Sequence, residues 1–151
     1  MADFADDWNV GVVRTPQILA ALAARTEVAL PEVEAHAREC CDQIAFNEAA
    51  WRIAVEHRMP QALVTVNPDL FDDHVVPAHG LAEVFDRIVM SYAEKTADEP
   101  TLCLTALRCL DFDGDRSSAL LIDNRIDLVR AWQDTGGPDT GSRATSSSGA
   151  T

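Results

Sequence analysis

Positive charge is scarce in this chain. Twelve lysines and arginines stand against 25 aspartates and glutamates, which gives a formal net charge of −13. A field of this sign repels phosphate backbones and anionic lipid headgroups, so we expect neither nucleic acid nor a membrane surface as a partner. A small anionic ligand remains compatible with the charge, because a helix N-terminus or a bound cation acts locally.

Long apolar runs and targeting signals are also lacking. The longest apolar run, Ile18 to Ala24, is too short to cross a bilayer, and the first residues have neither the basic nor the apolar region of a secretory signal. The four cysteines show no Cys-x-x-Cys spacing, which favours reduced thiols over a metal site. We therefore expect a cytoplasmic protein.

Familiar catalytic motifs are missing as well. The sequence has no glycine-rich phosphate loop, no Gly-x-Ser-x-Gly turn and no evident cysteine–histidine arrangement. His74 and His79 have no third partner at zinc-binding spacing. Composition thus leaves a single globular domain without a legible nucleophile.

Helical patterns dominate the first half of the chain. Thr15-Pro16 is a helix start signal, a capping hydroxyl followed by proline, and apolar residues then recur at helical spacing to about Arg25. Pro31 opens a second helical stretch, which we expect to break near Asn47 and to resume as far as His57.

The second half changes its period. Three short apolar runs, 62–66, 87–90 and 119–122, are typical of strands buried on both faces of a parallel sheet. Helical patterns lie between and after them, at 81–85, 101–110 and 126–133. Strand–helix alternation indicates right-handed βαβ units, and the predicted fold class is therefore α/β.

Polar side chains follow each predicted strand. Thr65 and Asn67 end the first run, Ser91 ends the second, and Asp123 with Asn124 ends the third. Ligands of open parallel sheets bind at the carboxyl ends of the strands. We expect these side chains to converge there.

The third of these positions suggests a metal. Asp127 follows Asp123 by four residues, so the two carboxylates with Asn124 and water provide oxygen ligands of the kind that Mg²⁺ prefers. The alternative is structural, with Asp123 or Asn124 capping the helix that starts near Arg125. Spacing alone leaves both readings open.

The order of these segments resembles the haloacid dehalogenase-like (HAD) hydrolase superfamily. The resemblance rests on Ala62-Leu-Val-Thr-Val-Asn67, Arg87-Ile-Val-Met-Ser91 and Leu120-Leu-Ile-Asp-Asn-Arg-Ile-Asp127 and covers about residues 60 to 137. It implies an incomplete Rossmann-like three-layer core at 60–136. The helical segment 1–59 looks like the small cap of such enzymes, and 137–151, rich in Gly, Ser and Thr, is expected to be a disordered tail.

The resemblance also implies roles for particular residues. Thr65, or Asn67 if the register differs, would bind the phosphate of a small phosphorylated substrate. Lys95 lies near the loop position of the family's phosphate-binding lysine, although the expected position itself, Asp98-Glu99, is acidic and Lys95 also reads as a surface residue. The segment Asp123 to Asp127 would hold Mg²⁺. The implied activity is that of a Mg²⁺-dependent phosphatase.

One essential part of the family pattern is missing. The family nucleophile is the first Asp of a D-x-D-x-[TV] motif after a central first strand, and the chain is expected to start at or after that point. The only early strand candidate, Val10 to Val13, ends in Arg14-Thr15, and Asp111 to Asp115 reads as a solvated loop after a helix. No catalytic residue is identified, so we expect weak or no activity of this chain.

A missing central strand has structural consequences. The domain would re-pair its flanking strands, recruit Val10 to Val13, or borrow a strand, which predicts a homo-oligomer or a strand-donating partner. Two other readings stay open: a non-catalytic phosphate-binding, metal-binding or protein-interaction relative of the fold, and an unrelated α/β fold in which Asp123 caps a helix.

Overall fold

The computed structural model describes residues 4–137, which fall into two compact units. Unit 1 extends to Phe112 and unit 2 begins at Asp113. The helices of unit 1 are α1 (Phe4–Asn9), α2 (Thr15–Thr26), α3 (Leu30–Asp42), α4 (Glu48–Glu56), a π-helical turn (Phe71–Val75), α5 (Val76–Ala78), α6 (Leu81–Val84), α7 (Ser91–Glu94) and α8 (Glu99–Cys109). Unit 2 contains a 3₁₀ turn (Arg116–Ser118) and α9 (Ile126–Asp134).

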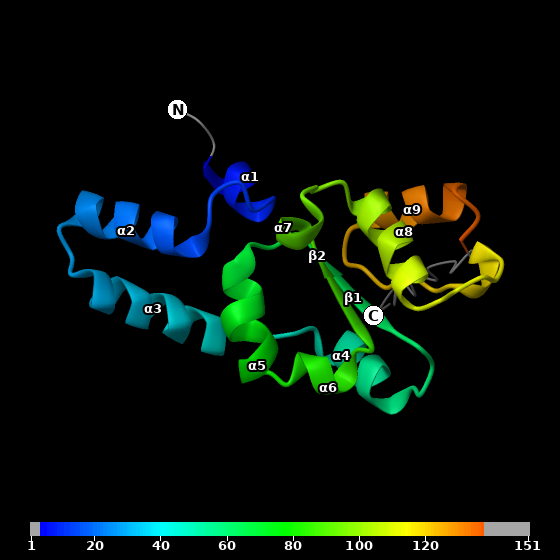
Figure 1. Cartoon of the computed structure of the whole chain (residues 1–151). Helices are drawn as coiled ribbons and strands as arrows, with labels where there is room; N and C mark the ends of the chain where they lie inside the picture. The colour runs from blue at the N-terminus through cyan, green and yellow to red at the C-terminus, as the bar shows by residue number, and fades with distance from the viewer. Residues whose placement is uncertain (1–3, 138–151) are drawn as a thin grey trace, which may run out of the picture. The chain divides into compact units, whose positions relative to one another are not determined.

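The sequence signals located the helices of the first half, but the prediction that the Thr15 hydroxyl caps α2 is wrong, because Arg14 is the N-cap residue and the Thr15 hydroxyl donates to Asp69. Helix α2 begins at Thr15, and Pro31 lies in the first turn of α3. The predicted break falls at Asn47, whose side chain accepts a hydrogen bond from the N–H of Ala50 and so caps α4. Helices α2 and α3 pack against each other (Figure 1) through Leu19, Ala23, Val33 and Ala37.

Two of the three predicted strands form. β1 (Ala62–Thr65) and β2 (Arg87–Met90) make a parallel two-stranded sheet in which Leu63 pairs with Ile88. The π-helical turn, α5 and α6 connect the two strands. Over the described residues the chain is therefore a mixed helix and strand protein with a small parallel sheet, which agrees with the α/β class.

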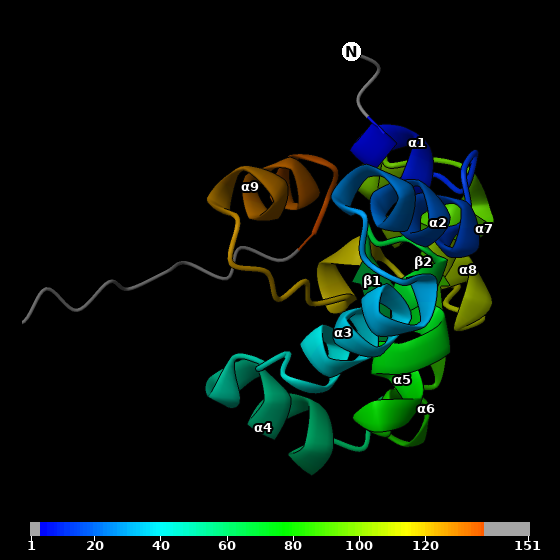
Figure 2. The same ribbon diagram turned by 90° about the vertical axis from the view of Figure 1, so that its left-hand side faces the viewer.

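Apolar side chains cover both faces of this sheet. On one face Ala62, Val64 and Val66 pack with Val89 and with Leu102 and Ala106 of α8. On the other face Leu63 and Ile88 join the cluster of Cys41, Val75 and Leu81. Figures 1 and 2 both place α1 and α7 near one end of the strands and α4 and α6 near the other. The carboxyl ends of both strands lead to α7 and to the loop that precedes the π-helical turn.

The third predicted strand is wrong. Residues 119–122 belong to no helix or strand among the described residues, and Leu120 and Ile122 are exposed. Apolar character favours an extended conformation, but a strand also needs a neighbour for its backbone hydrogen bonds. Val10 to Val13 likewise forms turns after α1 and no strand.

Other expectations have mixed outcomes. In the part of the chain that the structure describes, no helix is both long and apolar enough to span a membrane. All four cysteines are free, with Cys41 and Cys103 buried and Cys40 and Cys109 exposed. The predicted tail, 137–151, lies outside the described residues except for Gly137. The division at residue 59 stays a prediction, while contacts divide the chain after Phe112.

Candidate functional site

The predicted phosphate-binding residues meet at the carboxyl end of β1. Thr65 is the last residue of the strand, and the side-chain amide of Asn67 donates a hydrogen bond to the Thr65 hydroxyl oxygen. A hydroxyl that accepts one hydrogen bond keeps its own proton as a donor. The Thr65 hydroxyl is thus oriented by Asn67 and able to donate to an acceptor such as a phosphate oxygen.

The end of β2 is tied to the same place. Ser91 is fully buried, and its hydroxyl lies 2.6 Å from the carbonyl oxygen of Asn9 and 3.2 Å from that of Asn67. One hydroxyl proton serves these two carbonyls, and the shorter contact, to Asn9, is the stronger one. Ser91 therefore fastens the N-terminal segment to the ends of both strands and has no proton left for a ligand.

Lys95 lies next to this contact. It ends α7 in a left-handed conformation with φ of 59°, and its ammonium donates to the carbonyl oxygen of Gly11 at 3.2 Å. Within the described residues it forms no ion pair, and the side chain is exposed. Lys95 is also the only lysine of the sequence. Its charge is therefore available to an anion at this end of the sheet.

Gly11 is required for this approach. Its φ is 68°, and a Cβ built on it would lie 2.7 Å from both the Lys95 Nζ and the backbone oxygen of Tyr92. A side chain there would strain the left-handed backbone and push the N-terminal segment off α7. The contact between Lys95 and the segment that follows α1 thus depends on one glycine.

A buried carboxylate holds the same segment from the other side. Asp69 is 2% exposed and accepts hydrogen bonds from the Thr15 N–H at 3.1 Å, the Thr15 hydroxyl at 2.6 Å and the indole N–H of Trp8 at 3.3 Å. The Arg14 guanidinium adds an ion pair at 2.8 Å. Burial alone raises the pKa of Asp69, but the hydrogen bonds from Thr15 and the charge of Arg14 outweigh it and hold that pKa below the ordinary value.

Tyr92 completes the arrangement. The Arg14 guanidinium carbon lies 5.1 Å from the centre of the Tyr92 ring, and the tyrosine hydroxyl donates a hydrogen bond to Asp72. Burial, followed by the hydrogen bond to Asp72, raises the pKa of Tyr92 to about 12. Tyr92 therefore stays protonated at neutral pH and acts as a packing and hydrogen-bonding group.

Sequence reasoning found Thr65, Asn67, Ser91 and Lys95 but missed the Asp69 cluster. The only local signal was that Asp69 follows Asn67-Pro68, where the strand was predicted to end. Its partner Thr15 lies 54 residues earlier in the chain. No spacing rule connects two loops at that separation.

The predicted metal ligands belong to unit 2 and are described by themselves. The Arg125 guanidinium pairs with the Asp127 carboxylate at 3.0 Å, and the N–H of Arg125 donates to Asp123 at 2.7 Å. The hydrogen bond from Arg125, with its charge, lowers the pKa of Asp127. Among the described residues, no three His, Cys, Asp or Glu side chains gather in a way that could hold a metal ion. The assignment of Asp123, Asn124 and Asp127 to Mg²⁺, which counts an amide and water among the ligands, stays a prediction.

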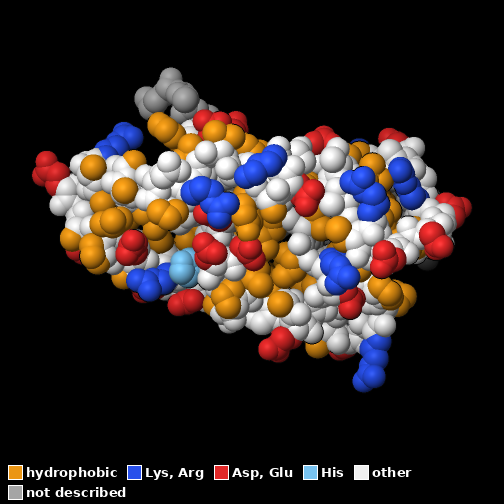
Figure 3. Space-filling model, viewed as in Figure 1, with side chains coloured by type: hydrophobic (Ala, Val, Ile, Leu, Met, Phe, Trp, Pro, Cys, Tyr) orange, Lys and Arg blue, Asp and Glu red, His pale blue; other side chains and the backbone are white. Residues whose placement is uncertain are grey.

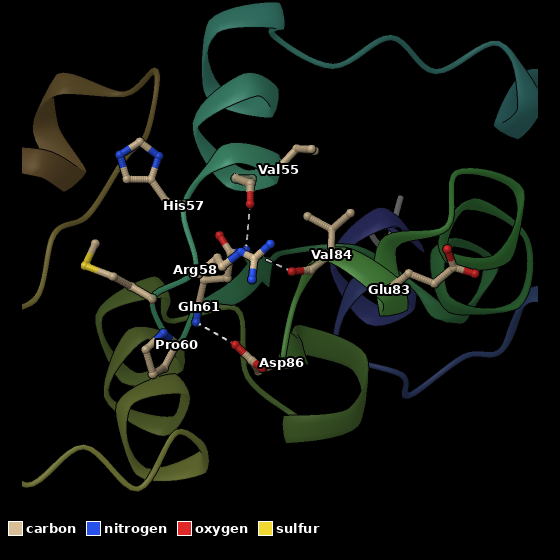
Figure 4. A pocket seen from close by; sticks show the side chains of 10 residues that line it. Val55, His57, Arg58, Pro60, Gln61, Glu83, Val84 and Asp86 are labelled. Carbon is tan, nitrogen blue, oxygen red and sulfur yellow. Dashed lines mark hydrogen bonds between the residues drawn. The ribbon is translucent and has the colours of Figure 1, made fainter.

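A shallow depression of about 400 Å³ lies at the opposite end of β1. Figure 4 shows Gln61 at its centre, where its side-chain amide donates to the carbonyl oxygens of Ala54 and Val84 and its N–H donates to Asp86. These bonds connect Gln61, just before β1, to α4, to α6 and to Asp86, just before β2. The depression contains none of the predicted site residues, and its polar groups serve the fold.

No family model, curated protein or solved structure matches this chain. The functional argument therefore rests on the residues and their geometry.

Proposed function

We propose that this chain is a HAD-like relative that binds the phosphate group of a small phosphorylated molecule at the carboxyl ends of β1 and β2. One observation carries the proposal. The oriented hydroxyl of Thr65 belongs to a hydrogen-bonded network that includes the segment after α1. The same segment accepts a hydrogen bond from the ammonium of Lys95, which forms no ion pair among the described residues. Hydroxyl and ammonium donors are suited to phosphate oxygens.

Several features support the resemblance to Mg²⁺-dependent phosphatases. The two strands are parallel, helices cover both faces of the sheet, and the polar residues follow the strand ends in the order expected from the superfamily. An incomplete Rossmann-like three-layer core at 60–136, built around the β1–β2 sheet, belongs to this proposal. So does the assignment of residues 1–59 as a cap.

Efficient hydrolysis by this chain alone is not part of the proposal. Phosphoryl transfer through a covalent intermediate needs a free carboxylate, whereas the Asp69 carboxylate at this end is buried and engaged by Trp8, Arg14 and Thr15. A phosphate held by Thr65 and Lys95 would therefore meet no activated nucleophile. We expect binding with little or no turnover.

The Arg125–Asp127 ion pair favours the structural alternative, in which these residues begin α9 and hold no metal. If Asp123 and Asp127 serve to begin α9, a folded chain will not bind Mg²⁺ in a calorimetric titration. If they are metal ligands, Mg²⁺ binds and Asp123→Ala abolishes the binding, while Asp111→Ala, which removes an exposed loop carboxylate, does not.

Calorimetry with inorganic phosphate tests the proposed function. Lys95→Met should weaken phosphate binding at least about tenfold, because a charge-assisted hydrogen bond is lost, and Thr65→Val should weaken it in the same direction. Arg25→Met is the matched control, since it removes one positive charge from an exposed position on α2. Equal affinities of the Lys95→Met and Arg25→Met variants, or no binding by the folded wild type, would contradict the proposal.

A further inference from the structure

The side of β1 that faces away from β2 is an edge of the sheet, although apolar groups cover both faces of the strand. Among the described residues, β1 has β2 as its only neighbouring strand. Helix α8 covers one face of the sheet and the cluster around Val75 and Leu81 covers the other. All β1 side chains are nevertheless only half-buried, while Val89 and Met90 of β2 are buried. β1 thus has the surroundings of an interior strand, but among the described residues only one of its two sides pairs with a strand.

The ladder determines which backbone groups face that side. The N–H of Asp86 donates to the carbonyl oxygen of Gln61 at 3.0 Å. Because the N–H and C=O of successive residues in a strand point alternately to its two sides, Leu63 and Thr65 also face β2. The backbone groups of Ala62, Val64 and Val66 therefore face outward, and no backbone hydrogen bond from elsewhere in the described part of the chain reaches them.

Apart from the shortness of the four-residue strand, this edge lacks the usual protection against pairing. Natural edge strands are blocked by charged side chains, proline or bulges. No charged residue lies between Arg58 and Asp69, and the prolines at 60 and 68 bound the segment without entering it. Because the whole chain has a net charge of −13, a segment without carboxylates allows two copies to approach each other without repulsion between acidic side chains.

The order of residues along the edge is self-complementary. Antiparallel pairing about Val64 places Val64 opposite Val64 of a second copy and Ala62 opposite Val66. Every outward N–H and C=O of these residues then meets a partner, as in the hydrogen-bonded pairs of an antiparallel ladder. The facing side chains are small or β-branched, which suits cross-strand packing.

We propose that β1 pairs antiparallel with β1 of a second copy of this chain, with Val64 on the two-fold axis. The pairing joins two β1–β2 sheets into one continuous sheet and forms an isologous dimer. It uses backbone groups that point away from β2, so it does not depend on the phosphate proposal.

Analytical ultracentrifugation over a range of protein concentrations tests this dimer. The wild type should show a monomer–dimer equilibrium. Val64→Pro removes the outward N–H in both copies and should raise the dimer dissociation constant at least about tenfold. Val64→Ala keeps the N–H while shortening the same side chain, and it should remain dimeric. A wild type that stays monomeric at every concentration would overturn the proposal.

Hydrogen exchange of the wild type gives a second test that needs no variant. Protection of the Val64 amide should rise with protein concentration, while protection of the Leu63 amide, which faces β2, should change little at the same concentrations. Protection of Val64 that is independent of concentration would mean that the chain's own residues cover the edge. A dimer with an unprotected Val64 amide would use another surface. Either result would overturn the proposal.

Discussion

Asp69 is the residue on which the N-terminal segment depends most. Its carboxylate is almost fully buried and binds groups from α1, from the loop before α2 and from Thr15 at the start of α2. Asp69→Asn keeps the shape but removes the charge and turns one acceptor into a donor. We expect the free energy of unfolding to fall by about 2–3 kcal/mol, because hydrogen bonds to a charged group are lost.

Urea denaturation measures this change. Asp73→Asn is the matched control, since Asp73 is an exposed carboxylate in the same part of the chain, and it should alter the free energy of unfolding by less than about 0.5 kcal/mol. Equal effects of the two substitutions would mean that Asp69 contributes no more than a surface carboxylate.

The lowered pKa of Asp69 predicts a pH dependence of stability. A group whose pKa is lower in the folded state stabilises it above the unfolded pKa, about 3.9 for aspartate, and this contribution is lost as pH falls through the folded value. The difference in unfolding free energy between wild type and Asp69→Asn should therefore be constant at neutral pH and shrink below about pH 4. A difference that grows on acidification would have the wrong sign for this account.

At the scale of elements, Gly11 and Gly80 form a natural comparison. Both have positive φ, 68° and 62°, but only Gly11 would bring a Cβ within 2.7 Å of backbone, at Tyr92; at Gly80 the nearest atom, a carboxylate oxygen of Glu83, is 3.8 Å away. Gly80→Ala should cost about 1 kcal/mol for the left-handed backbone alone.

Gly11→Ala adds the steric conflict and should cost more than about 2 kcal/mol. Urea denaturation ranks the two variants, and hydrogen exchange of residues 9–15 locates the damage. If Gly80→Ala is the more destabilising of the two, then the close packing of this segment on α7 does not stabilise the fold.

Element boundaries show what sequence can and cannot predict. Local signals located two helix starts: the proline of Thr15-Pro16 lies in the first turn of α2, and the Asn47 side chain caps α4. The apolar runs at 62–66 and 87–90 became strands because each has the other as its partner. The run at 119–122 is equally apolar but has no partner strand among the described residues. The presence or absence of a partner strand cannot be read from the local sequence.

The candidate site divides in the same way. The ends of the apolar runs predicted Thr65, Asn67 and Ser91, because the change from apolar to polar residues marks where a buried strand ends. The contacts of Lys95 with Gly11 and of Asp69 with Thr15 span 84 and 54 residues. They follow from the path of the N-terminal segment across the carboxyl ends of the strands, which is a property of the tertiary fold.

In the molecule as a whole, acidic side chains outnumber basic ones by 25 to 12. Acidic and basic side chains are interspersed on the face shown in Figure 3, and the global field of a chain with net charge −13 opposes anion binding. Phosphate binding therefore requires a local cation. Lys95 is the one lysine of the sequence, and it forms no ion pair with an acidic side chain of the described region.

That single lysine allows the most direct measurement. Reductive methylation with ¹³C-formaldehyde labels Lys95 and the N-terminal amine, and the methyl signals of both can be followed by NMR during titration with phosphate. The account predicts a saturable shift of the Lys95 signal and none of the amine, with the titration lost in Thr65→Val. A Lys95 signal that does not move, or that moves only in parallel with the N-terminal amine, would contradict it.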